Sequence, residues 1–254
     1  MDGDLHVRLT PNDQCTRRSL KALRWSAMRV QLTAAGFRQR PRSPGGDFSA
    51  LAGFQPSPVS AEIVQESVDT LSAYALVPSA FDVTAVMDIS RQGDRLALCE
   101  RVVATPFIKD YDAVQGNGPL DWPQHFDVSK AAFFVARKNG VRVGGAVAVL
   151  GPPDVAMLGR HDDLALLWDI RVIPDRRRKG VGSALLASVE HWVSSRGGTC
   201  LKVETQNINV PACRFYARHG FTLADVREDA YPELPGEIQL FWSKELAAFP
   251  AGTG

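Results

Sequence analysis

Residues 176–183, Arg-Arg-Arg-Lys-Gly-Val-Gly-Ser, are the most informative stretch of the sequence. They follow a nearly continuous apolar run, 164–172, that predicts a strand. They precede a segment whose apolar residues recur at every fourth position and predict one face of a helix: Val181, Leu185, Val189 and Val193. The two glycines let the backbone turn tightly with its N–H groups inward, and a helix N-terminus adds partial positive charge. With its four cationic side chains, this loop predicts a pyrophosphate-binding site.

The amino-acid sequence of the loop excludes two other phosphate-binding motifs. A P-loop ends in Gly-Lys followed by Ser or Thr, whereas Gly182 is followed by Ser183 and Ala184. A dinucleotide-binding fingerprint needs a third glycine at the position of Leu185, and it belongs to the first strand–helix unit of a domain. The remaining alternative is a solvated basic loop that binds no ligand.

A second stretch joins a strand predicted over 200–204 to a short helix predicted over 211–219. From Asn209 to Phe221 it reads N-x-x-A-x-x-F-Y-x-x-x-G-F. Together with Arg-x-x-Gly-x-Gly over 177–182, this pattern resembles the GNAT superfamily of acetyl-CoA-dependent N-acetyltransferases. The resemblance implies a central mixed β-sheet flanked by helices, with acetyl-CoA as the co-substrate.

Three stretches look like the streptothricin acetyltransferase branch of that family: 107–112, 167–172 and 202–213. Enzymes of this branch acetylate an amine on the lysine-like side chain of an antibiotic, so the expected partner is a small cationic amine. The second motif is also similar to ribosomal-protein alanine N-acetyltransferases. A protein N-terminus, a lysine side chain or a polyamine is therefore the alternative acceptor, and a catalytically silent acyl-CoA-binding module is a further alternative.

The resemblance implies that three segments bind acetyl-CoA. The end of the 164–172 strand would hold the pantetheine arm and present a backbone N–H to the oxyanion, and the basic loop would hold the pyrophosphate. Asn209, in the second motif, would bind the cofactor or hold the turn. The implied binding residues are Ile170, Arg171, Val172, Arg177, Arg178, Lys179, Gly180, Val181, Gly182, Ser183, Asn209 and Tyr216.

The chemistry needs a base and an acid. An amine attacks a thioester only when neutral, and a lysine-type ammonium is almost wholly protonated at pH 7. A base must therefore remove a proton, and an acid must protonate the departing thiolate. By their matches to the family, Glu204 is expected to be the base and Tyr216 the acid.

Asp169 is a second candidate for the base. A carboxylate between apolar neighbours is costly unless it is paired with a cation. Arg171 projects to the same face of the strand, two residues further on, and is the expected structural partner. The alternative partner is the amine of the substrate, which would give Asp169 a catalytic role.

The pattern over 61–247 predicts a single α/β domain with a mixed sheet. Asn139-Gly140 lies between apolar runs over 132–137 and 141–149 and predicts a hairpin. Further strands are predicted over 81–86, 95–99 and 237–242 from their apolar and β-branched content.

The charge of the chain is unevenly distributed. Twenty-nine Lys and Arg residues face 28 Asp and Glu residues, a net charge of +1 that argues against a generally basic nucleic-acid-binding protein. Residues 1–45, however, hold nine basic and three acidic side chains. Residues 1–60 are expected to be a disordered leader, with a basic functional arm or a start-site artefact as alternatives. Residues 248–254 are expected to form a flexible tail.

No other partner is predicted. No apolar run approaches the roughly 20 residues that span a bilayer. The four cysteines lie far apart without Cys-x-x-Cys spacing, so no metal is expected and the cytoplasm is the expected compartment. A twin-arginine-like stretch over 16–21 lacks an uninterrupted apolar core, because Arg24 and Arg29 follow it. A homodimer is compatible with the sequence.

Overall fold

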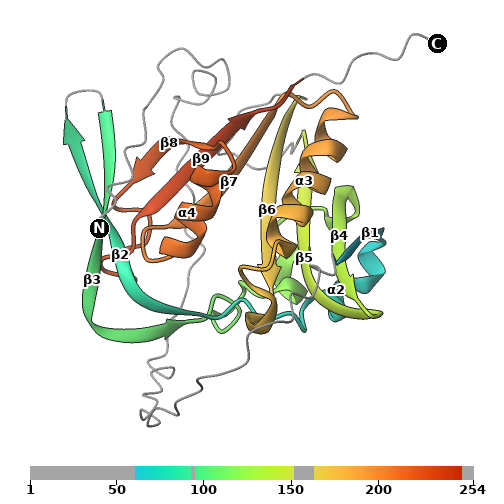
Figure 1. Ribbon diagram of the computed structural model, residues 1–254, viewed down its shortest axis with the longest axis horizontal. Coiled ribbons are helices and arrows are strands. Elements are labelled where there is room, and N and C mark those ends of the chain that lie inside the picture. The colour runs from blue at the N-terminus through green and yellow to red at the C-terminus, as the bar shows by residue number, and fades with distance from the viewer. Residues whose placement is uncertain (1–60, 93–94, 152–162, 248–254) are drawn as a thin grey trace, which may run out of the picture.

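The structure, a computed structural model, describes residues 61–92, 95–151 and 163–247. The leader predicted over 1–60 and the tail predicted over 248–254 lie outside these ranges. Within the described residues, a sheet of seven strands and a separate two-stranded ribbon form the β-structure (Figure 1). In spatial order the sheet contains β1 (Glu62–Glu66), β4 (Ala131–Lys138), β5 (Val141–Leu150), β6 (Leu164–Val172), β7 (Cys200–Gln206), β9 (Gln239–Glu245) and β8 (Thr222–Arg227). The ribbon consists of β2 (Phe81–Gln92) and β3 (Arg95–Lys109).

Helices cover both faces of the sheet. One face carries α3 (Val181–Ser194) and α4 (Val210–Arg218), as Figure 1 shows. Shorter helical turns contribute to an aromatic cluster on the other face or lead into the basic loop: η1 (Val68–Thr70), α2 (Leu71–Tyr74), η2 (Pro119–Gln124), η3 (Val128–Lys130) and η4 (Pro174–Arg176). None of the helices in the described ranges is long and apolar enough to cross a membrane.

The predicted α/β fold with a mixed sheet is confirmed. β6 and β7 are parallel, and every other neighbouring pair in the sheet is antiparallel. The predicted hairpin is β4–β5, and its turn residues Asn139 and Gly140 both have positive φ, 52° and 75°. Two consecutive positive φ angles are what a two-residue type I′ hairpin requires, and Asn-Gly adopts them at low cost.

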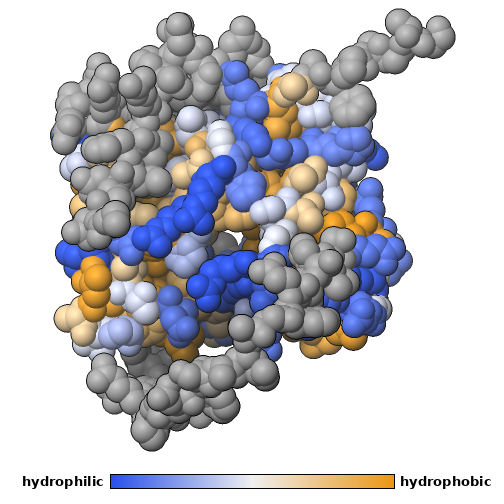
Figure 2. Space-filling model, in the orientation of Figure 1, coloured by the Kyte–Doolittle hydropathy of each residue, from blue (hydrophilic) through white to orange (hydrophobic). Residues whose placement is uncertain are grey.

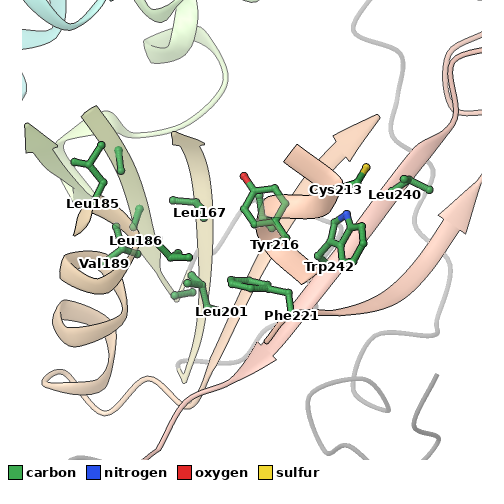
Figure 3. Packing of buried hydrophobic residues seen from close by; sticks show 14 of the residues in the cluster. Leu167, Leu185, Leu186, Val189, Leu201, Cys213, Tyr216, Phe221, Leu240 and Trp242 are labelled. Carbon is green, nitrogen blue, oxygen red and sulfur yellow. The ribbon is translucent and has the colours of Figure 1, made fainter. Parts of the chain in front are cut away.

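The main core lies between the sheet and the helices α3 and α4 (Figure 3). The four residues predicted to form one face of the helix after the loop are all buried there, which confirms that face. On the opposite face, Tyr74, Trp122, Phe133 and Val147 form a separate buried cluster. The sheet is therefore buried on both faces at its β4–β6 side.

The pairing of β6 with β7 ends early. Only Leu164–Leu167 and Cys200–Val203 are in register. On the other side of β6, Leu167 lies opposite Ala148 whereas Asp169 lies opposite Val147, so Trp168 is the extra residue of a β-bulge. Beyond this bulge both strands continue without a shared ladder, and the sheet opens between them.

Candidate active site

The opening between β6 and β7 is approached by predicted site residues from both faces of the sheet. Val203 is part of the core under α4, so its neighbour Glu204 projects from the opposite face. Tyr216 comes from α4, and Figure 3 shows its hydroxyl pointing away from Phe221 and Trp242. Figure 2 shows the surface hollowed near the centre of this view, between the regions of α4 and α3. A group lying in the opening would have Glu204 and Tyr216 on opposite sides.

Tyr216 is buried at 4% exposure by the aromatic rings of Phe215, Phe221 and Trp242. Burial raises the pKa of its hydroxyl, and the negative charge of Asp169 raises the pKa further. A phenol in this environment stays protonated at neutral pH, so it is suited to donating a proton. Within the described ranges its hydroxyl has no hydrogen-bond partner in the protein.

Glu204 lies in a polar network at the end of β7. The hydroxyl of Tyr231 and the amide of Gln206 both donate to its Oε1, the amide at 3.4 Å. Burial raises the pKa of the Glu204 carboxyl, whereas Gln239, Tyr231 and the charge of Arg227 act in the opposite direction. A carboxylate with a raised pKa takes up a proton nearer to neutral pH, as a general base must.

Asp169 is paired with Arg171, which is the structural one of its two expected partners. Arg171 donates to both carboxylate oxygens of Asp169 at 2.8 and 2.9 Å, and the Tyr74 hydroxyl donates to Asp169 Oδ2 at 2.5 Å. Arg171 also donates to both oxygens of Asp112, at 2.7 and 3.2 Å, and to the Val77 carbonyl at 3.0 Å. These bonds satisfy the guanidinium fully, so its side chain belongs to the framework of the site.

The basic loop leaves backbone donors at the start of α3. Arg178 and Gly180 have positive φ, 59° and 83°, and Gly180 forms the N-cap without a side-chain cap. The first backbone bond of the helix runs from Ala184 N to the Gly180 carbonyl at 3.0 Å. The N–H groups of Val181, Gly182 and Ser183 therefore have no acceptor within the helix.

The cationic residues of the loop differ in their surroundings. Arg177 donates from Nε to the Val172 carbonyl at 2.9 Å and from Nη2 to the Ala80 carbonyl at 2.8 Å. Burial lowers the pKa of Arg177. It thus ties the loop to the end of β6 and to the segment before β2, whereas Arg178 and Lys179 are exposed.

The start of α3 contacts the end of α4. The imidazole of His219 lies 2.9 Å from the Ser183 hydroxyl. Gly182 packs against the Phe215 ring: a Cβ atom built at Gly182 would lie 3.4 Å from the ring, which is ordinary van der Waals contact. The two motifs are therefore in contact in the fold, although more than twenty residues separate them in the sequence.

Two further expected cofactor-binding positions, Asn209 and Val172, have structural roles. Asn209 caps α4 by accepting a hydrogen bond from Ala212 N at 3.2 Å, which is the turn-holding role among its two expected roles. The Val172 carbonyl accepts the bond from Arg177. Ile170 is half-buried and pairs with Ala146 of β5, so its other backbone edge faces the opening.

Several polar residues of the site were not predicted. Tyr111 donates to Gln206 Oε1, and Gln206 Nε2 donates to the Tyr231 hydroxyl at 2.9 Å. Tyr111 and Gln206 lie within the stretches 107–112 and 202–213 that carry the family resemblance, so a signal for them was present. Tyr231 lies in the connection between β8 and β9, and no motif marks it.

Asn207 joins three parts of the site and was also not predicted. Its backbone N–H donates to the Ile238 carbonyl at 3.0 Å, and its backbone carbonyl accepts from Met87 N at 2.9 Å. Its side-chain oxygen accepts from Ile238 N at 2.8 Å, and its amide donates to the carbonyls of Met87 and Gly236, both at 3.3 Å. Asn207 thus connects β7 to the ribbon and to the β8–β9 connection.

Comparison with known proteins agrees with this arrangement. The profile of the Acetyltransferase (GNAT) family matches residues 103–221. The chain is 44% identical over 145 residues to streptothricin acetyltransferase A of Bacillus subtilis (strain 168), covering 56% of this chain and 76% of that protein. It is 36% identical over 74 residues to the ribosomal protein bS18-alanine N-acetyltransferase of Escherichia coli (strain K12), covering 29% of this chain and 50% of that enzyme.

Solved structures share the fold. A crystal structure of nourseothricin acetyltransferase, 24% identical, superposes with a TM-score of 0.59 over 74% of this chain and 100% of that one. A protein of Bacillus anthracis str. Ames in complex with acetyl coenzyme A, 22% identical, gives a TM-score of 0.60 over the same shares. The chain belongs to the GNAT family of acetyltransferases and is an acetyl-CoA-dependent N-acetyltransferase.

Proposed function

We propose that this enzyme acetylates a primary amine of a small cationic antibiotic of the streptothricin type. The observation that carries the proposal is the 44% identity over 76% of a streptothricin acetyltransferase. The crystal structure of nourseothricin acetyltransferase shares the fold of this chain, which supports a similar opening between β6 and β7 in such enzymes. The activity would inactivate the antibiotic and confer resistance.

The basic loop is proposed to hold the pyrophosphate of acetyl-CoA. The N–H groups of Val181, Gly182 and Ser183 are free of helical acceptors, and a helix N-terminus carries partial positive charge. The exposed side chains of Arg178 and Lys179 add cationic groups that a phosphate can reach. The unpaired edge of β6 around Ile170 offers backbone groups to the amides of the pantetheine arm.

Each side of the opening supplies one group for proton transfer, Glu204 on one side and Tyr216 on the other. Glu204 takes a proton from the ammonium group, and the neutral nitrogen attacks the thioester carbonyl carbon, forming the C–N bond. A backbone N–H near Ile170 stabilises the oxyanion of the tetrahedral intermediate. The C–S bond breaks as Tyr216 donates its proton to the sulfur. The nitrogen loses its second proton to solvent, and the proton held by Glu204 passes through solvent to Tyr216. Both groups thereby return to their starting states, and the reaction releases one proton in total.

We call the part of the opening around Glu204, Asp112 and Asp169 the acceptor side. Its net negative charge favours a cationic amine as the substrate. Asp169 and Asp112 share a single guanidinium, that of Arg171, so two negative charges face one positive charge. The neighbouring Lys109 is neutralised by Glu237 at 2.5 Å. The surplus negative charge suits a polycationic amine and disfavours an anionic acceptor.

Release of free thiol from acetyl-CoA tests the proposal. The amines compared are a streptothricin mixture, spermidine, free lysine, and a peptide with an N-terminal alanine, each with wild-type enzyme and with Glu204→Gln. The streptothricin mixture is expected to give the highest kcat/KM, and Glu204→Gln is expected to lose most of it. Release with the peptide alone would replace the antibiotic with a protein N-terminus. No release with any amine would overturn the proposal.

A further inference from the structure

Three segments meet in a hydrogen-bonded chain that ends on Glu204. Tyr111, which follows β3, donates to the Oε1 of Gln206 at the end of β7. The Nε2 of Gln206 donates to the hydroxyl oxygen of Tyr231 at 2.9 Å, and Tyr231 donates to the Oε1 of Glu204. Each donor in this hydrogen-bonded chain points in the same direction, towards the Glu204 carboxylate. The Glu204 carboxylate fixes this direction: an ionised carboxylate only accepts, so Tyr231 donates to it and accepts from the Gln206 amide.

Both tyrosines remain donors. Burial and the charge of Glu204 raise the pKa of Tyr231, and burial followed by the charge of Glu237 raises the pKa of Tyr111. A protonated phenol beside a carboxylate stabilises the charged form of that carboxylate. The Tyr231 hydroxyl therefore lowers the pKa of Glu204 against the effect of burial.

We infer that Tyr231 is a positioning residue for Glu204: it holds the carboxylate at the opening and keeps it able to accept a proton. This inference rests on the proposed role of Glu204 as the base. The other groups that act on Glu204 are Gln206 on its own strand, Gln239 on β9 and the charge of Arg227 on β8. Tyr231 differs from these groups because it donates its hydrogen bond from a hydroxyl and lies in the connection between β8 and β9.

The test is the pH profile of kcat/KM for the amine in Tyr231→Phe. This variant keeps the ring and removes only the hydroxyl. Loss of the hydrogen bond raises the pKa of Glu204, so the acidic limb of the profile is expected to move up by about one pH unit. On the acidic limb kcat/KM is expected to fall by up to about tenfold, the factor that a one-unit shift gives, and the KM for acetyl-CoA is expected to stay at the wild-type value.

Tyr74→Phe is the matched control. It removes the hydroxyl of Tyr74, a buried tyrosine that also donates to a carboxylate, but this carboxylate is Asp169. It is expected to lower the melting temperature without moving the acidic limb. Because the stability of the protein changes with pH through Glu204, circular dichroism at each pH gives the folded fraction of Tyr231→Phe, and kcat/KM is normalised to that fraction.

A double-mutant cycle separates the inference from the proposed function. In the Glu204→Gln background, Tyr231→Phe is expected to cause little further loss, because its effect acts through the carboxylate. An unmoved acidic limb, or a full additional loss in that background, overturns the role of Tyr231 while Glu204→Gln keeps only its low residual activity. Full activity of Glu204→Gln would instead overturn the assignment of the base itself.

Discussion

Arg171 binds Asp169 through two parallel hydrogen bonds, from Nε to Oδ2 at 2.8 Å and from Nη2 to Oδ1 at 2.9 Å. The Arg171 side chain is only 5% exposed, and the rings of Tyr74 and Trp122 lie 5.4 and 5.8 Å from its guanidinium carbon. A charge this deeply buried is stable only when its donors are satisfied. The pairing therefore gives Asp169 a structural task beside the opening, whatever else it does.

Asp169→Asn is expected to destabilise the protein more than it changes the chemistry. The substitution removes a charge from a buried pair and turns an amide N–H towards the Arg171 donors, although Asp112 still binds the guanidinium. The expected cost is about 2 kcal/mol in the free energy of unfolding. Urea denaturation measures this cost, and the pH profile of kcat/KM measures the catalytic effect.

These two measurements separate the roles considered for Asp169. If Asp169 has only its structural role, the substitution lowers the unfolding free energy and leaves the acidic limb of the profile in place. If Asp169 is also the base, the substitution lowers the unfolding free energy and abolishes the limb. The second pattern would return the base assignment from Glu204 to Asp169.

Tyr216→Phe tests the acid. The variant keeps the ring that packs against Phe215, Phe221 and Trp242, so folding is expected to be unchanged. Loss of the proton donor is expected to lower kcat roughly a hundredfold, with little change in acetyl-CoA affinity. Stopped-flow thiol release gives kcat, and calorimetric titration with CoA gives the affinity. An unaltered kcat would remove Tyr216 from the acid role.

Local sequence signals predicted the parts of the fold that local physics controls. The Asn139-Gly140 turn and the apolar face of α3 depend on neighbouring residues, and both were predicted. The strands predicted over 81–86 and 95–99 proved to be parts of β2 and β3, which are 12 and 15 residues long. Strand β8 was not predicted.

The site depends more on contacts between distant segments, which a single sequence does not reveal. Arg177 matches the pyrophosphate motif, yet its guanidinium bonds to the carbonyls of Val172 and Ala80. Ala80 is almost a hundred residues away in the chain, so no local pattern could indicate this contact. The same reason explains why Tyr231 was not predicted. Its partners Glu204 and Gln206 lie on β7, whereas Tyr231 lies between β8 and β9.

Asn207→Asp is expected to loosen the acceptor side of the site. The substitution keeps the oxygen that accepts from Ile238 N but replaces the amide that donates to Met87 and Gly236 with a second oxygen facing two carbonyls. Buried acceptors without a donor cost about 2 kcal/mol, or roughly 4–8 °C in melting temperature for a domain of this size. The KM for the amine is expected to rise, whereas the KM for acetyl-CoA is expected to stay constant. Equal changes in both KM values would contradict a role confined to the acceptor side.

Glu204→Gln is expected to remove most of the activity and, at neutral pH, to make the protein more stable. Burial raises the pKa of Glu204 in the folded protein above its ordinary value of 4.5. The folded state therefore binds this proton more tightly than the unfolded state, and its contribution to stability is full below pH 4.5 and is lost as the pH rises through the folded pKa. Glutamine keeps an oxygen that can accept from Tyr231 and never ionises. The melting temperatures of the two proteins should agree near pH 4 and separate as the pH rises, with the variant higher. A difference in melting temperature that is constant across this range, or one that favours the wild type at pH 7, would show that burial does not raise the pKa of Glu204.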